Sequence, residues 1–195
     1  MPIVIPIFCS FPPALAMAAI IREKSLKPYM LVHPNCLADL PPVEDGEHDA
    51  VVIGDAVDDF SFKNINKAFQ VIIEKNCPYY SLGKGKFYRE DGKLQLDVGA
   101  YAALLEFATD KPAIVVGKPS PDFFQAALND MKVAATDACM VGDDIVSDVG
   151  GAQNCGVQGI LVRTGKYRAS DENHPKVKPD KIVDNLLEIV ELILK

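Results

Sequence analysis

The sequence predicts an α/β protein whose sheets are mostly parallel and covered by helices on both faces. Along the whole chain, short apolar runs alternate with longer segments whose apolar residues recur at helical spacing. This alternation is typical of strand–helix–strand units. Two of the runs, residues 115–117 and 140–142, end in a glycine that is followed by charged residues. Because ligands bind at the carboxyl ends of strands in open α/β sheets, we expect the functional site there.

The first part of the chain extends to a boundary near residues 110–112. Its clearest helix is 61–75, because Ser61 can cap it and its apolar residues repeat at helical spacing. Asp91-Gly92 is a strong turn pair in the middle of a hairpin predicted at 86–96. The other elements predicted in this part are helices at 13–24 and 99–109 and strands at 28–33, 51–54 and 79–82.

After that boundary, strand and helix alternate strictly. Pro121 fits the first position of a helix, and Ser120 could cap that helix. The predicted strands are 113–116, 139–141, 159–162 and 181–183, and the predicted helices are 122–131, 145–154 and 185–194.

Composition argues against several classes of function. The formal net charge is −7 at pH 7, whereas a nucleic-acid-binding face needs a basic surplus. The five cysteines show no C-x-x-C spacing, which favours free thiols in a reducing compartment over disulfides or a zinc site. We therefore expect a cytoplasmic protein, with the nucleus as a second location, and no nucleic-acid partner.

The first 21 residues are almost wholly apolar, but prolines interrupt them at positions 2, 6, 12 and 13. A signal peptide has a basic start, whereas no basic residue precedes Arg22, and a membrane helix tolerates few such breakers. We therefore expect no membrane partner. The segment predicts a core strand followed by a helix that begins near Pro12, with an irregular start to the chain as the alternative.

Asp143 and Asp144 are the sharpest functional feature of the sequence. Two adjacent carboxylates at a strand end repel each other unless a cation lies beside them. Asp148, near the start of the following helix, can point toward the same edge, and oxygen ligands of this kind suit Mg²⁺. The alternative is that Asp144 caps the helix and that Asp148 is solvated near the positive end of the helix.

Two lysines are candidates for contacting an anion. Lys118 follows a strand, and Pro119 fixes its backbone, so it could neutralise a nucleophile or a phosphoryl oxygen; the alternative is a surface lysine in a loop. Lys84 lies in the basic segment 83–86, which is too short for a P-loop; it could contact an anionic substrate or form a plain turn. The segment 163–166 also follows a strand and could lie at the same edge.

Two motifs, Val116-Gly117-Lys118-Pro119 and Gly142-Asp143-Asp144-x-x-x-Asp148, resemble in order and spacing the third and fourth motifs of the haloacid dehalogenase (HAD) superfamily of phosphatases. The resemblance covers roughly residues 14–195. It implies a Rossmann-like core, of which the chain holds the second half, and an inserted α/β cap. The implied division is an atypical N-terminal segment at 1–13, a type-two cap at 14–110 and the C-terminal half of the core at 111–195.

The resemblance also implies a chemistry. In this family an Asp attacks phosphorus and a second Asp, two residues on, protonates the leaving group. Lys118 would steady the nucleophile and the phosphoryl charge. Asp143 would bind Mg²⁺ directly, and Asp144 and Asp148 would hold the ion or its waters. Substrates would be small phosphorylated compounds, pyrophosphate or P–N bonds, and a homodimer would form through the cap.

The chain departs from the first motif of the family, because it contains no Asp-x-Asp pair. The candidate for the second motif, a strand ending in Ser or Thr, is Ser10. Without an activated nucleophile the covalent route is closed. We therefore expect this chain to be truncated before the nucleophilic Asp and to be weakly active or inactive. The alternative is a non-catalytic binding or regulatory protein that keeps the cap and half of the metal site.

Overall fold

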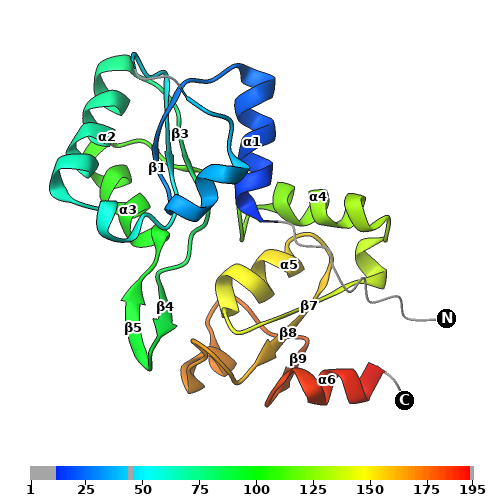
Figure 1. Ribbon diagram of the computed structural model, residues 1–195. Coiled ribbons are helices and arrows are strands. Elements are labelled where there is room, and N and C mark those ends of the chain that lie inside the picture. Colours follow the sequence, from blue (N-terminus) through cyan, green and yellow to red (C-terminus); the bar gives the residue numbers. More distant parts are fainter. Residues whose placement is uncertain (1–11, 44–45, 194–195) are drawn as a thin grey trace.

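The computed structural model describes residues 12–43 and 46–193, and it contains two parallel sheets (Figure 1). In spatial order, the first sheet consists of β1 (Pro28–Leu31), β2 (Ala50–Ile53), β3 (Tyr79–Ser81) and β6 (Ile114–Val115). The second sheet consists of β7 (Cys139–Gly142), β8 (Gln158–Val162) and β9 (Lys181–Val183). The predicted α/β class with parallel sheets is confirmed.

Helices cover both sheets. The first sheet packs against α1 (Pro13–Lys24), α2 (Phe62–Lys75) and α3 (Val98–Thr109). The second part contains α4 (Pro121–Met131), a π-helical turn η4 (Ile145–Gly150) that continues into α5 (Gly151–Gln153), and α6 (Leu186–Ile193). Short 3₁₀ turns are η1 (Pro34–Asp39), η2 (Val57–Asp59), η3 (Ala135–Asp137) and η5 (Ala169–Asn173). None of the helices described is long and apolar enough to cross a membrane.

The first sheet is the middle layer of three, because its side chains alternate between two apolar clusters. Val52 and Tyr80 pack with Met17 and Ala18 of α1 on one face. On the other face, the neighbouring strand residues Val51, Ile53 and Tyr79 pack with residues of α2 and α3, namely Ala68, Ile72, Ala102 and Leu105. Figure 1 shows α1 on one side of this sheet and α2 and α3 on the other.

The second sheet is covered in the same way. Ile160 and Val162 of β8 face Ile189 of α6. Leu161, between them, faces the opposite side and packs against Ile145 and Val149 of η4. This alternation fixes the orientation of η4, whose N-cap is Asp144 and whose first turn carries Asp148.

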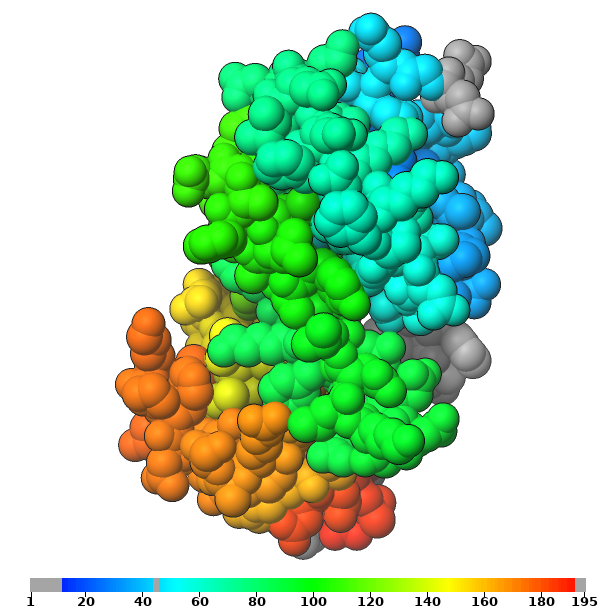
Figure 2. Space-filling model, turned by 90° about the vertical axis from the view of Figure 1, so that its left-hand side faces the viewer, coloured from blue at the N-terminus to red at the C-terminus, as the bar shows by residue number. Residues whose placement is uncertain are grey.

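A hairpin leaves the first part and reaches the second. Its strands β4 (Phe87–Glu90) and β5 (Lys93–Leu96) pair antiparallel. Asp91 and Gly92 connect them with φ values of 48° and 75°, which are the positive values that an Asp-Gly turn of this kind requires. In Figure 2 the hairpin, in green, rests against the orange segment that follows β8.

Most of the predicted elements are confirmed within two residues of their expected ends. Ser61 caps α2 as expected, since its Oγ accepts a hydrogen bond from the Asn64 amide at 3.3 Å. Helix α1 begins at Pro13, as the expected start near Pro12 required. The preceding apolar segment, for which a core strand was predicted, lies outside the described residues.

Three local expectations need correction. Ser120 makes no capping hydrogen bond, so Pro121 alone starts α4. The predicted helix at 145–154 begins instead as a π-helical turn and becomes α-helical only at Gly151. Strand β6, predicted to open the second series, pairs with β3 in the first sheet. The second sheet therefore begins only at β7, and the boundary near residues 110–112 remains a prediction.

The packing of η4 on β8 predicts a large loss of stability on substitution of Leu161. This side chain has 0% exposure, so Leu161→Ala should lower the free energy of unfolding by about 2–5 kcal/mol through lost burial and a residual cavity. Urea unfolding measures the change. Leu187→Ala is the matched control, because Leu187 is 65% exposed and should change stability by less than ~0.5 kcal/mol. Equal effects of the two changes would contradict this packing.

Candidate active site

The carboxyl ends of strands from both sheets open into one cleft of about 390 Å³. Lys84 follows β3, Lys118 follows β6 and Asp143 follows β7, so three separate strand ends bring charged side chains to the same cavity. The charged residues that line it are Asp55, Lys84, Asp97, Lys118, Asp143, Asp148 and Lys166. The sequence-based expectation of a shared edge is therefore met, but the edge is formed by two sheets rather than one.

Lys118 and Asp148 form the closest ion pair of the cleft. Lys118 Nζ lies 2.7 Å from Asp148 Oδ1, and the other carboxylate oxygen accepts the backbone N–H of Asp144 at 3.2 Å. The Asp148 side chain is only 7% exposed, whereas that of Lys118 is 40% exposed. Gly142 permits this arrangement, because a Cβ there would stand 2.3 Å from Asp148 Oδ2. Asp148 is thus buried and paired, and not solvated as the alternative interpretation held.

Asp144 is turned away from its neighbour Asp143. Its Oδ1 accepts the N–H groups of Val146 and Ser147, both at 2.9 Å, and so caps η4. Its Oδ2 lies 3.1 Å from Lys166 Nζ. Burial acts to raise the pKa of Asp144, but the Ser147 N–H and the Lys166 ammonium outweigh it, so the pKa is lowered. The capping role considered for Asp144 is confirmed.

Asp143 is held by the loop that follows β8. Its Oδ2 accepts the backbone N–H of Lys166 at 2.8 Å. Gly165, which precedes that amide, has φ of +53°, and a Cβ at Gly165 would lie 1.8 Å from the same oxygen. The backbone can approach the carboxylate this closely only because residue 165 is a glycine.

Lys166 joins the carboxylates of the cleft. Besides Asp144, its Nζ lies 4.0 Å from Asp97 Oδ2, which belongs to the first part of the chain. Burial acts to lower the pKa of Lys166, but Asp144, with Asp97 and Asp143, outweighs it, so the pKa is raised and the side chain stays charged.

The carboxylates of the cleft fit a magnesium ion only in part. Within residues 12–43 and 46–193, no three His, Cys, Asp or Glu side chains are grouped closely enough to hold a metal ion by themselves. Asp144 and Asp148 are each paired with a lysine. However, Mg²⁺ keeps several waters and takes only one or two carboxylates along with substrate phosphate oxygens. The site therefore fits this ion if Asp143 supplies the one direct carboxylate and if waters and substrate phosphate oxygens supply the other ligands.

The structure brings most of the predicted site residues together. Lys84, Lys118, Asp143 and Asp148 line the main cleft, and Asp144 lines an adjoining cavity of about 240 Å³. Ser10 lies outside the described residues.

Sequence reasoning considered the segment 163–166 only as a group at the same edge, and it missed Asp97 altogether. In the sequence, Asp97 fits only the pattern of a helix cap before α3, and a helix cap does not indicate a cleft.

Comparisons with known proteins identify the family of the chain. A family model described as HAD-hydrolase-like matches residues 115–189, the part that contains Lys118 and the three aspartates. The chain is also 50% identical over 183 residues to a protein of Xenopus laevis, and the match covers 93% of this chain and 68% of that protein. The chain therefore belongs to the haloacid dehalogenase-like hydrolases, and by homology it is a HAD-type phosphatase. The Xenopus relative is named phospholysine phosphohistidine inorganic pyrophosphate phosphatase.

Solved structures share the fold. A 4-nitrophenylphosphatase of Thermotoga maritima has a TM-score of 0.79 at 24% identity, over 92% of this chain and 70% of that one. A glycerol phosphate phosphatase of Mycobacterium tuberculosis, in complex with magnesium, has a TM-score of 0.74 at 23% identity, over 91% of this chain and 56% of that one. These similarities confirm the expected architecture of a Rossmann-like core with a cap.

The lowered pKa of Asp144 predicts a pH-dependent contribution to stability. Because the carboxylate is favoured in the folded state, this contribution is fully present above its ordinary pKa of 3.8 and is lost as pH falls through the lower folded value. Asp144→Asn should therefore reduce the free energy of unfolding at neutral pH. The difference from the unchanged protein should shrink below about pH 4. Chemical unfolding at a series of pH values measures this, and a difference that is constant with pH would contradict it.

Proposed function

We propose that the cleft binds the phosphoryl group of a small phosphorylated compound together with Mg²⁺. The chemistry of the site suits hydrolysis of a phosphoric monoester, pyrophosphate or a P–N bond. The observation that carries the proposal is the Lys118–Asp148 pair at 2.7 Å beside Asp143 in a cleft formed by strand ends. A lysine oriented by a buried carboxylate presents a fixed positive charge to a phosphoryl oxygen.

Charge balance supports a role for the cation. The main cleft is lined by four carboxylates and three lysine ammonium groups, so a phosphate dianion meets a net negative cavity. A bound Mg²⁺ reverses that sign, and it also neutralises charge on phosphoryl oxygens. Asp143 would bind the ion directly, and Asp144 and Asp148 would hold its waters.

The remaining residues of this chain have separate tasks. Lys118 orients the phosphoryl group, and Asp148 holds Lys118 in place through the ion pair. Lys84, exposed beside the same cavity, contacts the part of the substrate that lies toward the hairpin. The Xenopus relative is named for phospholysine, phosphohistidine and pyrophosphate, and we extend these substrate classes to this chain as part of the proposal.

The lack of the family's nucleophile motif limits the activity expected of these 195 residues. They contain no Asp-x-Asp pair, and the covalent route needs an activated nucleophile. We propose that this polypeptide binds Mg²⁺ and phosphate with weak or no turnover. A binding or regulatory role without catalysis is the second candidate, and the missing pair is the observation that favours it.

The first test is phosphate release from pyrophosphate and from an aryl phosphate, with and without Mg²⁺. We expect little release from the 195 residues, and turnover once a strand carrying Asp-x-Asp is added ahead of them. Lys118→Ala and Asp143→Asn should abolish that turnover. Lys132→Ala and Asp137→Asn are the matched controls, since both residues are exposed outside the cleft. An extended, folded protein that releases no phosphate would overturn the phosphatase assignment and leave the binding role.

Two further properties belong to the same proposal. A homodimer through the cap is supported by Leu104 and Phe107 of α3, which are 48% and 90% exposed. Light scattering should give twice the chain mass, and Phe107→Ser should halve it; a monomer at micromolar concentration would refute the dimer.

A cytoplasmic or nuclear location is supported by the free thiols of Cys36, Cys77, Cys139 and Cys155. Cell fractionation tests the location.

A further inference from the structure

A single peptide unit links the cap hairpin to Asp143. The carbonyl oxygen of Gly165 accepts a hydrogen bond from Arg89 Nε at 3.2 Å. The N–H of the same peptide unit, which belongs to Lys166, donates to Asp143 Oδ2 at 2.8 Å. The two ends of one amide group thus contact β4 on one side and the candidate metal ligand on the other.

Arg89 is oriented for this contact by its own hairpin. Its Nη1 donates to the carbonyl of Gly92 in the hairpin turn at 2.9 Å. The guanidinium is planar and rigid, so a bond made by Nη1 fixes the direction in which Nε points. The position of the hairpin turn is therefore transmitted to the Gly165 carbonyl through one inflexible group.

Phe87, at the start of β4, is anchored at the same place. Lys166 Nζ lies 3.5 Å from the carbonyl oxygen of Phe87, and the Arg168 guanidinium lies 4.2 Å from the centre of the Phe87 ring. These contacts come from β4, whereas all four residues of β5 are exposed. The hairpin thus rests on the loop 165–168 through β4, and Figure 2 shows the green hairpin in contact with the orange segment.

We propose that Arg89 is a positioning residue that fixes the Asp143 carboxylate through the Gly165–Lys166 peptide, so that docking of the hairpin and cation binding at Asp143 favour each other. The amide is polarised from both ends, since hydrogen bonds in a chain strengthen one another. Coupling between two such events is reciprocal: whatever docking adds to cation affinity, the cation adds to docking. The cation half of this inference rests on the proposed function.

The first experiment needs no metal. Amide hydrogen exchange of the ¹⁵N-labelled protein should show that Arg89→Ala speeds exchange of the Lys166 amide by about 3- to 10-fold, because the peptide loses one of its two fixed ends. Asp143→Asn should likewise speed exchange in the hairpin, residues 87–96. In the Asp143→Asn background, Arg89→Ala should add much less than it does alone.

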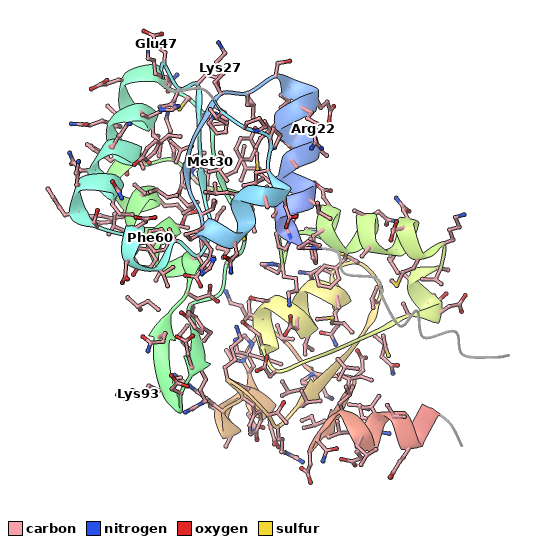
Figure 3. The ribbon with its side chains drawn as sticks, in the orientation of Figure 1. Arg22, Lys27, Met30, Glu47, Phe60 and Lys93 are labelled. Carbon is pink, nitrogen blue, oxygen red and sulfur yellow. The ribbon has the colours of Figure 1, made fainter. Side chains whose placement is uncertain are left out.

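Lys93→Ala is the matched control, because Lys93 is a cation at the tip of the same hairpin (Figure 3) and is exposed. It should leave the Lys166 amide unchanged. Arg89→Ala that speeds exchange in the hairpin but leaves the Lys166 amide as protected as before would overturn the proposal, since Arg89 would then stabilise only its own turn. Additive effects of Arg89→Ala and Asp143→Asn would overturn it as well.

The second experiment uses the cation alone. Mn²⁺, measured by its electron paramagnetic resonance signal, should bind the Arg89→Ala protein about 10-fold more weakly than the unchanged protein, as expected for loss of a group that orients a ligand. Lys93→Ala should bind Mn²⁺ normally, and equal affinity in all three proteins would overturn the coupling. If no protein binds Mn²⁺ while the metal-free exchange results hold, the proposed metal site fails and the positioning role of Arg89 stands.

Discussion

The site depends first on the ion pair between Lys118 and Asp148, because it ties the two sheets together where their strand ends meet. Lys118 follows β6 of the first sheet and Asp148 lies in η4 against the second. Asp148 is buried, and a buried carboxylate is tolerated only when it is paired and hydrogen-bonded. Lys118 and the Asp144 N–H supply both conditions. Separation of the two parts would leave the Asp148 carboxylate without its lysine partner, so the pair constrains the width of the cleft.

The pairing of β6 with β3 gives that constraint its geometry. Gly117, at the exit of β6, is packed so tightly that a Cβ would lie 2.1 Å from the carbonyl oxygen of Leu82. The chain therefore leaves the first sheet along a fixed path, directly beside the segment that carries Lys84. Lys84 and Lys118, which follow the adjacent strands β3 and β6, therefore enter the cleft from the first sheet, whereas Asp143 and Asp148 enter it from the segment that follows β7.

Periodicity and turn chemistry were enough to predict most elements, because those signals are local. The Ser61 cap, the Asp91-Gly92 turn and the parallel strands all follow from a few neighbouring residues. The partner of β6 could not be predicted in this way, because a short apolar run such as 113–116 fits either sheet equally well. Asp97 was missed for a similar reason: its helix-capping role is local, whereas its approach to Lys166 depends on how the hairpin folds back.

The adjacent aspartates show why spacing indicates a site without fixing its geometry. Spacing predicted a shared cation for Asp143, Asp144 and Asp148, yet each carboxylate has a different partner: the Lys166 amide, the Lys166 ammonium and Lys118. Repulsion among the three is therefore already compensated by groups of the protein. If a divalent ion binds as proposed, only Asp143 is left to bind it directly, and its affinity would depend on how firmly the Lys166 amide holds that carboxylate. Control over the proposed metal site would then lie in the loop after β8 and in the hairpin that contacts it, as well as in the acidic motif.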